Sequence, residues 1–223
     1  MRISVVIPAL NESEYIEGAL RSASAPGVEI IVADGGSVDG TAEAARALGA
    51  KVVVIPPGRA AQMNAGAAAA TGDALVFLHA DTRLPENYGE LIREALSSPG
   101  VVAGAFTLSI DSDKRCLRVI ERLAGFRTRR LGMPYGDQGI FVSADAFRSV
   151  GGFPDIPIME DYEFVRRLQR RGRLACLDAC AVTSARRWER LGALRVTLVN
   201  QFIIAGYALG ISPARLARWY RGE

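Results

Sequence analysis

Short runs of valine and isoleucine alternate with helix-like segments through the first half of the chain, and this alternation constrains the fold strongly. Continuous apolar runs are typical of strands buried on both faces of a parallel sheet. We therefore expect an α/β fold in which helices cover both faces of a mostly parallel central sheet. The expected strands are 3–7, 28–33, 51–55 and 74–78, and the expected helices are 12–23, 39–49 and 60–70.

The second half is less regular, but it continues to mix strands and helices. With 223 residues and no visible repeat or linker, we expect a single domain over residues 1–223. The expected strands are 101–110, 139–143 and one or two within 174–183, and the expected helices are 86–97, 115–128, 144–149, 160–171, 192–208 and 213–221.

Charge is distributed unevenly along the chain. Residues 1–114 carry a net charge of −6 and residues 115–223 a net charge of +9. Only Lys51 and Lys114 are lysines among 27 basic residues. The excess of arginine suits contacts with phosphate, although a GC-rich genome would give the same bias.

The three cysteines match no zinc pattern, so we expect reduced thiols in a cytoplasmic protein. The first residues after Met1 resemble a strand rather than a secretory signal.

Four loops follow the C-terminal ends of the first four expected strands, where parallel sheets bind ligands. Helix capping explains Asp39 and Thr41, but it explains Asp34 and Asp81 less well. The glycines near Asp34 do not have dinucleotide-binding spacing, and no phosphate-loop lysine is present. A phosphatase pattern also fails, because His79 stands where its nucleophilic aspartate would be. The loops are 8–12, 34–41, 56–59 and 79–82.

Four ordered blocks resemble the family 2 glycosyltransferases, which are inverting enzymes of the GT-A fold. They are VVIPALNE (5–12), EIIVADGGSVDGT (29–41), GRAAQMNAGAAAATGDALVFLHADT (58–82) and IPIMEDYEFVRRLQRRG (156–172). The resemblance covers about residues 3–172 and implies a Rossmann-like sheet. It also implies a nucleotide-sugar half over about 1–110, an acceptor half over about 111–190 and C-terminal helices over about 191–223. The HADT variant and the segment SARRWE (184–189) resemble a small soluble bacterial subgroup.

The resemblance implies a donor site built from the four loops. Asp34 would accept a hydrogen bond from the nucleobase, and Arg59 would lie near the donor phosphates or base. The triplet His79, Ala80 and Asp81 replaces the usual D-x-D motif, so Asp81 would bind the Mg²⁺ or Mn²⁺ ion that bridges the two phosphates. His79 either shares a contact to the ribose or sugar or only fills space. Pro8 and Ala9 would contact the nucleoside through their backbone, and Glu12 would lie near the same pocket or cap a helix.

The resemblance also implies the catalytic and acceptor residues. Asp161 would be the general base that takes a proton from the acceptor hydroxyl, with Glu160 in reserve, whereas the alternative is two ordinary acids opening a helix. Asp137 and Gln138 would contact the transferred sugar. Arg187 and Trp188, together with Arg186, resemble a segment that processive relatives use near the diphosphate and acceptor.

The implied function is metal-assisted, inverting transfer of a sugar from a nucleotide diphosphate donor, most simply a UDP-sugar, to a hydroxyl acceptor. The acceptor is a small or lipid-linked molecule, and no nucleic-acid partner is expected. Two alternatives are a nucleotide-sugar-binding protein without catalysis and a nucleotidyltransferase, although PALNE lacks the glycines and lysine that the latter needs. The apolar segment 196–211 could belong to the core, form a homodimer contact or lie on the inner face of a membrane.

Overall fold

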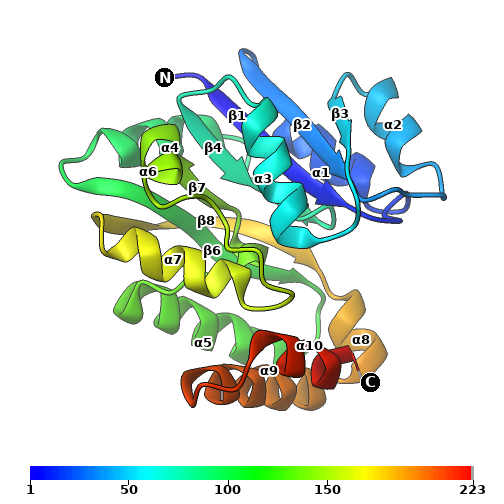
Figure 1. Cartoon of the computed structure of the whole chain (residues 1–223), viewed down its shortest axis with the longest axis vertical. Coiled ribbons are helices and arrows are strands. Elements are labelled where there is room, and N and C mark those ends of the chain that lie inside the picture. The colour runs from blue at the N-terminus through cyan, green and yellow to red at the C-terminus, as the bar shows by residue number, and fades with distance from the viewer. Residues whose placement is uncertain (222–223) are drawn as a thin grey trace.

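A computed structural model describes residues 1–221 and contains one eight-stranded sheet, in the order β3-β2-β1-β4-β7-β6-β8-β5 (Figure 1). The first four strands of that order are parallel to one another, and β6 and β8 are also parallel. β7 is antiparallel to both of its neighbours, and β5 to β8. The strands are β1 Ile3–Ala9, β2 Val28–Asp34, β3 Lys51–Val54, β4 Ala74–Phe77, β5 Thr82–Arg83, β6 Val101–Asp111, β7 Ile140–Ser143 and β8 Arg173–Ser184.

Helices cover both faces of the sheet, as the alternating sequence pattern predicted. Side chains alternate along β1, so Val5 and Ile7 face α1 and α4, whereas Val6 faces α3 and α7. The helices are α1 Ile16–Ala23, α2 Thr41–Ala47, α3 Arg59–Ala69, α4 Tyr88–Ser97, α5 Arg115–Leu131, α6 Ala144–Ser149, α7 Glu160–Gln169, α8 Arg186–Leu191, α9 Ala193–Ala208 and α10 Pro213–Arg221, with a 3₁₀ turn at Gly136–Gln138.

Several boundaries differ from the sequence prediction. The first helix begins at Ile16 rather than residue 12, because Glu12 to Tyr15 form a turn whose carbonyls start the helix. β8 is one strand of twelve residues, and a shift in its register with β6 accounts for the irregular pattern of its sequence. The two-residue strand β5 and the short helix α8 were not predicted, since neither is long enough to show a periodicity.

The C-terminal helices pack on the loop that precedes α7. Ile203 of α9 and Leu216 of α10 form a small core with Met159, and Tyr162 packs edge-on against Tyr207. The expected helices at 192–208 and 213–221 are thus present, and the inner face of α9 belongs to a core. No helix within residues 1–221 combines the length and the apolar character needed to cross a bilayer.

Candidate active site

The sheet topology brings distant parts of the sequence together at one edge. β1, β2 and β4 run parallel, so their C-terminal ends and following loops lie side by side. β7 runs antiparallel to β4 and pairs Ile140 with Phe77, which places the turn Gly136–Gln138 beside His79. β8 pairs Thr183 with Thr82, so the residues after β8 reach Asp81, and the Asp81 carbonyl accepts a hydrogen bond from the Ser184 amide at 2.9 Å.

The first two loops are fixed to each other by side-chain hydrogen bonds. Asp34, which is 2% exposed, accepts from the amides of Gly36 and Ser37 at 3.0 and 2.9 Å and also from the Ser37 hydroxyl. Its carboxylate therefore holds its own loop and retains one of its four acceptor positions. Asn11 adopts a left-handed backbone with φ 53° and accepts from the Val38 amide at 3.0 Å.

Gln62 is a buried residue of this region that the sequence analysis missed. Its side-chain amide donates to the carbonyls of Ala9 and Ala33, both at 2.8 Å, and so joins the ends of β1 and β2. Ala9 is buried, and its carbonyl is already used by Gln62 and by the Gly35 amide. A polar residue among the alanines of α3 was the only signal for Gln62 in the sequence.

A small cavity at the strand ends joins residues that lie far apart in the sequence. His79 and Gly136 are in close contact there, since a Cβ added to Gly136 would lie 2.6 Å from His79 Nε2 and 3.6 Å from Asp161 Oδ2. Only glycine at position 136 leaves room for the imidazole in this position. The cavity is lined by Pro8, Arg59, Phe77, His79, Gly136 and Asp161, among others.

The imidazole of His79 is neutral at physiological pH. Burial, followed by the positive charge of Arg59, lowers the pKa of His79 to about 4, while the carboxylates of Asp81 and Asp161 act in the opposite direction. A neutral imidazole has one donor and one acceptor nitrogen, so His79 can hydrogen-bond a sugar hydroxyl from either side. Asp81, Asp161 and Arg59 therefore all lie close enough to the His79 ring to influence its charge.

Asp81 is held in an ion cluster with Arg186 and Glu12. Arg186 Nε lies 3.0 Å from Asp81 Oδ2, and its two terminal nitrogens each lie 2.7 Å from an oxygen of Glu12. The guanidinium also stacks over the Tyr15 ring, 4.5 Å from its centroid. The cluster therefore joins the ends of β1, β4 and β8 across 174 positions of sequence.

Asp161 lies in the first turn of α7, where the helix dipole favours a carboxylate. Its Oδ2 accepts from the Gly136 amide at 2.9 Å and its Oδ1 from the Tyr162 amide at 2.7 Å, so its orientation is fixed. Met159, two residues earlier, has a left-handed backbone with φ 68°. Such strain in a residue with a side chain is concentrated at functional sites, and Asn11 beside Glu12 is the other instance within residues 1–221.

Glu160 has a different environment from Asp161. It is 4% exposed and pairs with Arg59 across 3.3 Å. Burial raises the pKa of Glu160, and the neighbouring Arg59 opposes this shift. Glu160 therefore holds Arg59, which lines the cavity, and Asp161 is the acid of the pair that lines it as well.

The 3₁₀ turn places Asp137 and Gln138 differently. Asp137 has one oxygen, Oδ1, that is shielded from solvent and has no hydrogen-bond partner within residues 1–221. Burial raises the pKa of Asp137 to about 6, and Arg127 opposes the shift. Gln138 is fully buried, and its amide bonds Phe106, Thr128 and the Tyr135 backbone. The expected sugar contact of Gln138 does not fit this position, because the side chain has no exposed surface.

The arginine–tryptophan segment needs a similar correction. Arg187 lies 3.3 Å from Asn200 Oδ1 and stacks on Tyr220, so it points to the C-terminal helices. Trp188 packs with Ala185 and Ala193 in a separate apolar cluster beside β6. The expected diphosphate and acceptor contacts of Arg187 and Trp188 do not fit these positions, and Arg186 is the residue that reaches the site.

Asp81 is the residue of this site best suited to a divalent cation. No group of three histidine, cysteine or acidic side chains within residues 1–221 could hold a metal ion by itself. Mg²⁺ and Mn²⁺ accept a single carboxylate when phosphate oxygens and water supply the remaining ligands. The donor set thus fits a cation that binds together with a diphosphate, and Asp81, 17% exposed, would hold it.

Comparison with known proteins matches this arrangement to one family. The family model described as glycosyl transferase family 2 matches residues 4–155. The succinoglycan biosynthesis protein ExoA of Rhizobium meliloti (strain 1021) is 29% identical over 192 residues, which is 75% of this chain and 58% of that protein. The chain therefore spans less than two thirds of the length of this relative.

Solved structures of glycosyltransferases share the fold. Glucosyl-3-phosphoglycerate synthase from Mycobacterium tuberculosis, in complex with Mn²⁺, uridine diphosphate and glucosyl-3-phosphoglycerate, is 25% identical with a TM-score of 0.64. The match covers 91% of this chain and 78% of that one. S. aureus TarS in complex with UDP is 17% identical with a TM-score of 0.67, over 82% of this chain and 60% of that one, and shows the fold alone. The expected GT-A fold is confirmed, and because the family model covers most of its length, the chain belongs to glycosyl transferase family 2.

Proposed function

We propose that the protein transfers a sugar from a nucleotide diphosphate donor to a hydroxyl acceptor, with inversion at the anomeric carbon. The observation that carries this proposal is the placement of His79, Asp161 and Arg59 around one cavity, with Asp81 two residues after His79 and paired with Arg186. These groups come from four separate segments, and together they offer a base, a polar sugar contact and positive charge around one cavity.

UDP is the proposed donor nucleotide. The remaining acceptor position of Asp34 could receive the N3–H of uracil, which guanine and adenine do not offer in the same geometry. The mycobacterial synthase with 25% identity binds uridine diphosphate, and its complex also contains Mn²⁺. The mannosyltransferase PcManGT from Pyrobaculum calidifontis was solved in complex with GDP-Man and Mn²⁺, so a GDP-sugar is the donor to compare.

Asp161 is the proposed general base. Two backbone amides orient its carboxylate, and each oxygen keeps a free position for the acceptor proton. His79 would hydrogen-bond the transferred sugar beside Gly136 and keep the anomeric carbon in line between Asp161 and the diphosphate. Asp137 is the second acid at the sugar, and Oδ1 is the atom with unused hydrogen-bonding capacity.

Charge on the departing diphosphate requires stabilisation on the side of Asp81. Arg59 and Arg186 are the arginines closest to the site, and both side chains are partly exposed. A Mg²⁺ or Mn²⁺ ion held by Asp81 would supply Lewis-acid neutralisation of the same charge when it is bound. We therefore propose that the positive groups near Asp81 stabilise the leaving diphosphate, and that the negative charge of Asp161 acts on the acceptor hydroxyl.

The test is a donor hydrolysis and transfer assay with UDP-sugars and GDP-sugars, in the presence of Mg²⁺ or Mn²⁺. Asp161→Asn should lower kcat at least a hundredfold with little change in UDP affinity, and Asp81→Ala should weaken UDP binding in the presence of the cation. The anomeric configuration of the product, read by proton NMR, should be inverted relative to the donor. Activity that survives both substitutions would refute the assignment, and UDP binding without turnover would favour a non-catalytic binding protein.

A further inference from the structure

Four helices gather at one end of the molecule, the lower end in Figure 1, and they contain 13 of its 27 basic residues. Residues 115–131 and 186–221, which comprise α5 and α8 to α10, contain thirteen arginines and two glutamates but no lysine or aspartate. We call the outer surface of these helices the helical end. These helices contain 13 of the 19 arginines of residues 115–223.

An apolar stripe runs along the outside of α5. Cys116, Val119, Leu123 and Phe126 follow one another at spacings of three and four, which places them on one face of a helix. Val119, Leu123 and Phe126 are 52, 60 and 63% exposed. The inner face of the same helix, with Leu117 and Ala124, is already buried, so the stripe is a second apolar face. An ordinary surface helix has a polar face in that position.

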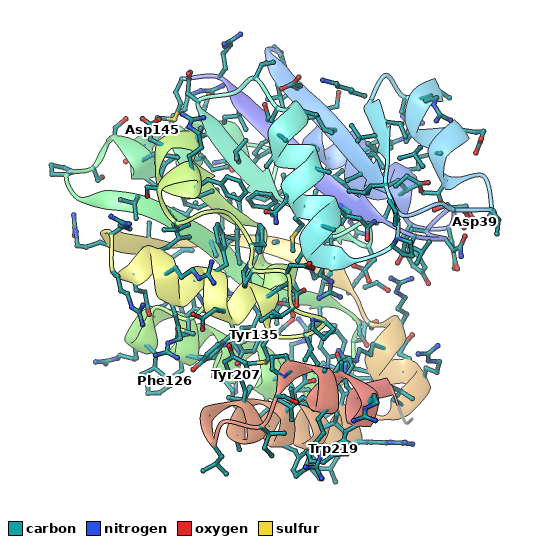
Figure 2. The ribbon with its side chains drawn as sticks, viewed as in Figure 1. Asp39, Phe126, Tyr135, Asp145, Tyr207 and Trp219 are labelled. Atoms are coloured by element: carbon teal, nitrogen blue, oxygen red, sulfur yellow. The ribbon has the colours of Figure 1, made fainter. Side chains whose placement is uncertain are left out.

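α9 repeats this arrangement. Val196 and Ile203 are buried on its inner side, whereas Leu194, Leu198 and Phe202 are 73, 59 and 56% exposed. The Phe202 ring lies 5.5 Å from the ring of Trp219 on α10, which extends the apolar surface to a tryptophan. Phe126 and Trp219 lie at the same end of the molecule in Figure 2.

Arginines surround these apolar side chains without acidic partners. Arg129 pairs with Asp178, but seven other exposed arginines of the helical end form no salt bridge with any residue of 1–221. Arg215 stacks on Trp219, 5.0 Å from the ring centroid. The seven are Arg115, Arg122, Arg130, Arg190, Arg195, Arg215 and Arg218.

We propose that the helical end docks on the surface of an anionic lipid bilayer. Helices that lie in the interface present leucine and phenylalanine to the acyl chains and basic residues to the phosphates. Tryptophan prefers the headgroup level, where Trp219 would lie between Arg215 and Arg218. The exposed apolar side chains match the acyl chains of such a bilayer, and the arginines match its phosphates. The proposal rests on this combination, because an apolar surface or a basic surface alone would not require a membrane.

Charge argues against a second copy of the chain as the occupant of this surface. A two-fold dimer would bring the same patch of both subunits together. The arginine-rich surface would then face itself, and only Glu121 and Glu189 are available in these helices to balance it. Both of these acids already pair with basic neighbours, Arg118 and Lys114. An anionic bilayer supplies the missing negative charge.

Docking would also orient the candidate active site. The inner faces of α9 and α10 pack on Met159, and Tyr207 donates a hydrogen bond to Glu163 at 3.4 Å on the helix that carries Asp161. The catalytic segment is therefore attached to the helices that would touch the bilayer. If the protein transfers a sugar as proposed above, this arrangement favours an acceptor hydroxyl on a lipid-linked molecule over one on a freely diffusing molecule.

Binding to vesicles tests the docking separately from catalysis. The protein should sediment with vesicles of phosphatidylcholine and phosphatidylglycerol in equal parts, should bind weakly to phosphatidylcholine alone, and should be released as salt is raised. The double variant Leu123→Asp, Phe126→Asp should bind at least tenfold more weakly, and Arg122→Gln should bind about fivefold more weakly. Val38→Asp, at a position that is 91% exposed in the loop after β2, is the matched control and should bind as the wild type does.

Two further measurements keep the outcomes distinct. Donor hydrolysis by the double variant should equal that of the wild type, which shows that it is folded and that the docking and the proposed function can fail independently. Light scattering after gel filtration should give a monomer. Absence of vesicle binding, binding that the double variant does not weaken, or a dimer that the double variant dissociates would each overturn the proposal.

Discussion

Arg186 and Asp81, 105 positions apart in the sequence, form an ion pair at 3.0 Å between Nε and Oδ2, and Glu12 holds the other side of the same guanidinium. One cation thus balances two partly buried carboxylates. Tyr15 packs against its face. This ion cluster connects the loop after β1 to the residues that follow β8. An arginine is needed at position 186 because its planar guanidinium can contact both carboxylates at once, which a lysine ammonium cannot do in the same geometry.

The first prediction concerns this ion cluster. Arg186→Ala should lower the free energy of unfolding by about 1–2 kcal/mol, because Glu12 and Asp81 are then left together without a counter-charge. In a Glu12→Gln background the same substitution should cost less, since only one carboxylate remains. Urea unfolding of the wild type, the two single variants and the double variant gives the coupling energy between Arg186 and Glu12. Arg187→Ala is the matched control, and an equal cost in both backgrounds would contradict the cluster as an energetic unit.

The second prediction uses His79, the only histidine of the chain. Its pKa of about 4 in the folded protein lies below the usual 6.5, so the unfolded chain binds more protons between these values. The contribution of His79 to stability is therefore complete above about pH 6.5 and is lost as the pH falls toward 4, by up to about 1.4 kcal/mol per pH unit. His79→Gln should remove this dependence.

Two measurements check the titration of His79. Proton NMR of its ring should show the neutral form down to about pH 5, and the stability difference between wild type and His79→Gln should change between pH 6.5 and 4.5. The difference is needed because Asp137 titrates in the same range with the opposite sign. An imidazole that titrates near 6.5 would mean that the ring is solvated and is not part of an enclosed site.

The third prediction is that Asp137→Asn stabilises the fold and impairs activity. The raised pKa of Asp137, about 6, means that its protonated form is favoured in the folded protein and that stability is lost as the pH rises from about 4 through 6. The neutral amide avoids this loss, so the variant should gain about 2 kcal/mol at pH 7.5 and little at pH 4. Thermal unfolding at the two pH values measures it. A variant that is less stable at pH 7.5 would show that the carboxylate has a partner in the folded protein.

The fourth prediction tests the contact between Gly136 and His79. Gly136→Ala places a methyl group where the His79 ring lies, and the ring must move away from the cavity. Donor turnover should fall at least tenfold, with only a small change in melting temperature. Gly18→Ala on α1 is the control, because its new Cβ would lie at an ordinary 3.8 Å from Arg83 and would leave turnover unchanged. Full activity of Gly136→Ala would mean that His79 does not contact the substrate.

The sequence predicted the parallel half of the fold well because each strand there is an apolar run, and the central strands β1 and β4 are buried almost throughout. Val5, Val6 and Ile7 are all fully buried, and no surface pattern interrupts them. The antiparallel part was harder, since β7 has four residues and pairs on both sides through contacts that are distant in sequence. The edge strand β5 exists only because β8 provides a partner for Thr82 and Arg83.

The sequence predicted the site residues that directly follow a strand. It did not predict which of them lie close together, because that depends on how the strands pair in the folded protein. Asp81 and Asp161 could be selected from motifs, but their relation through His79 and Gly136 depends on the antiparallel register of β4 and β7. The choice between Arg186 and Arg187 depends on one position at the start of α8, which the sequence does not fix. Gln138 was expected to contact the transferred sugar, although its side chain is fully buried.

The last prediction is that cation binding requires the nucleotide. Asp81 is a single carboxylate already paired with Arg186, and residues 1–221 offer no other set of ligands that could hold a metal ion. Mn²⁺ alone should therefore leave the melting temperature unchanged, whereas Mn²⁺ with UDP should raise it by more than UDP alone. Asp81→Ala should abolish the added shift and keep the shift caused by UDP, while Asp111→Ala, an exposed aspartate paired with Arg83, should behave as the wild type. A shift with Mn²⁺ alone that disappears in Asp81→Ala would instead show that the ion displaces Arg186 without help from phosphate.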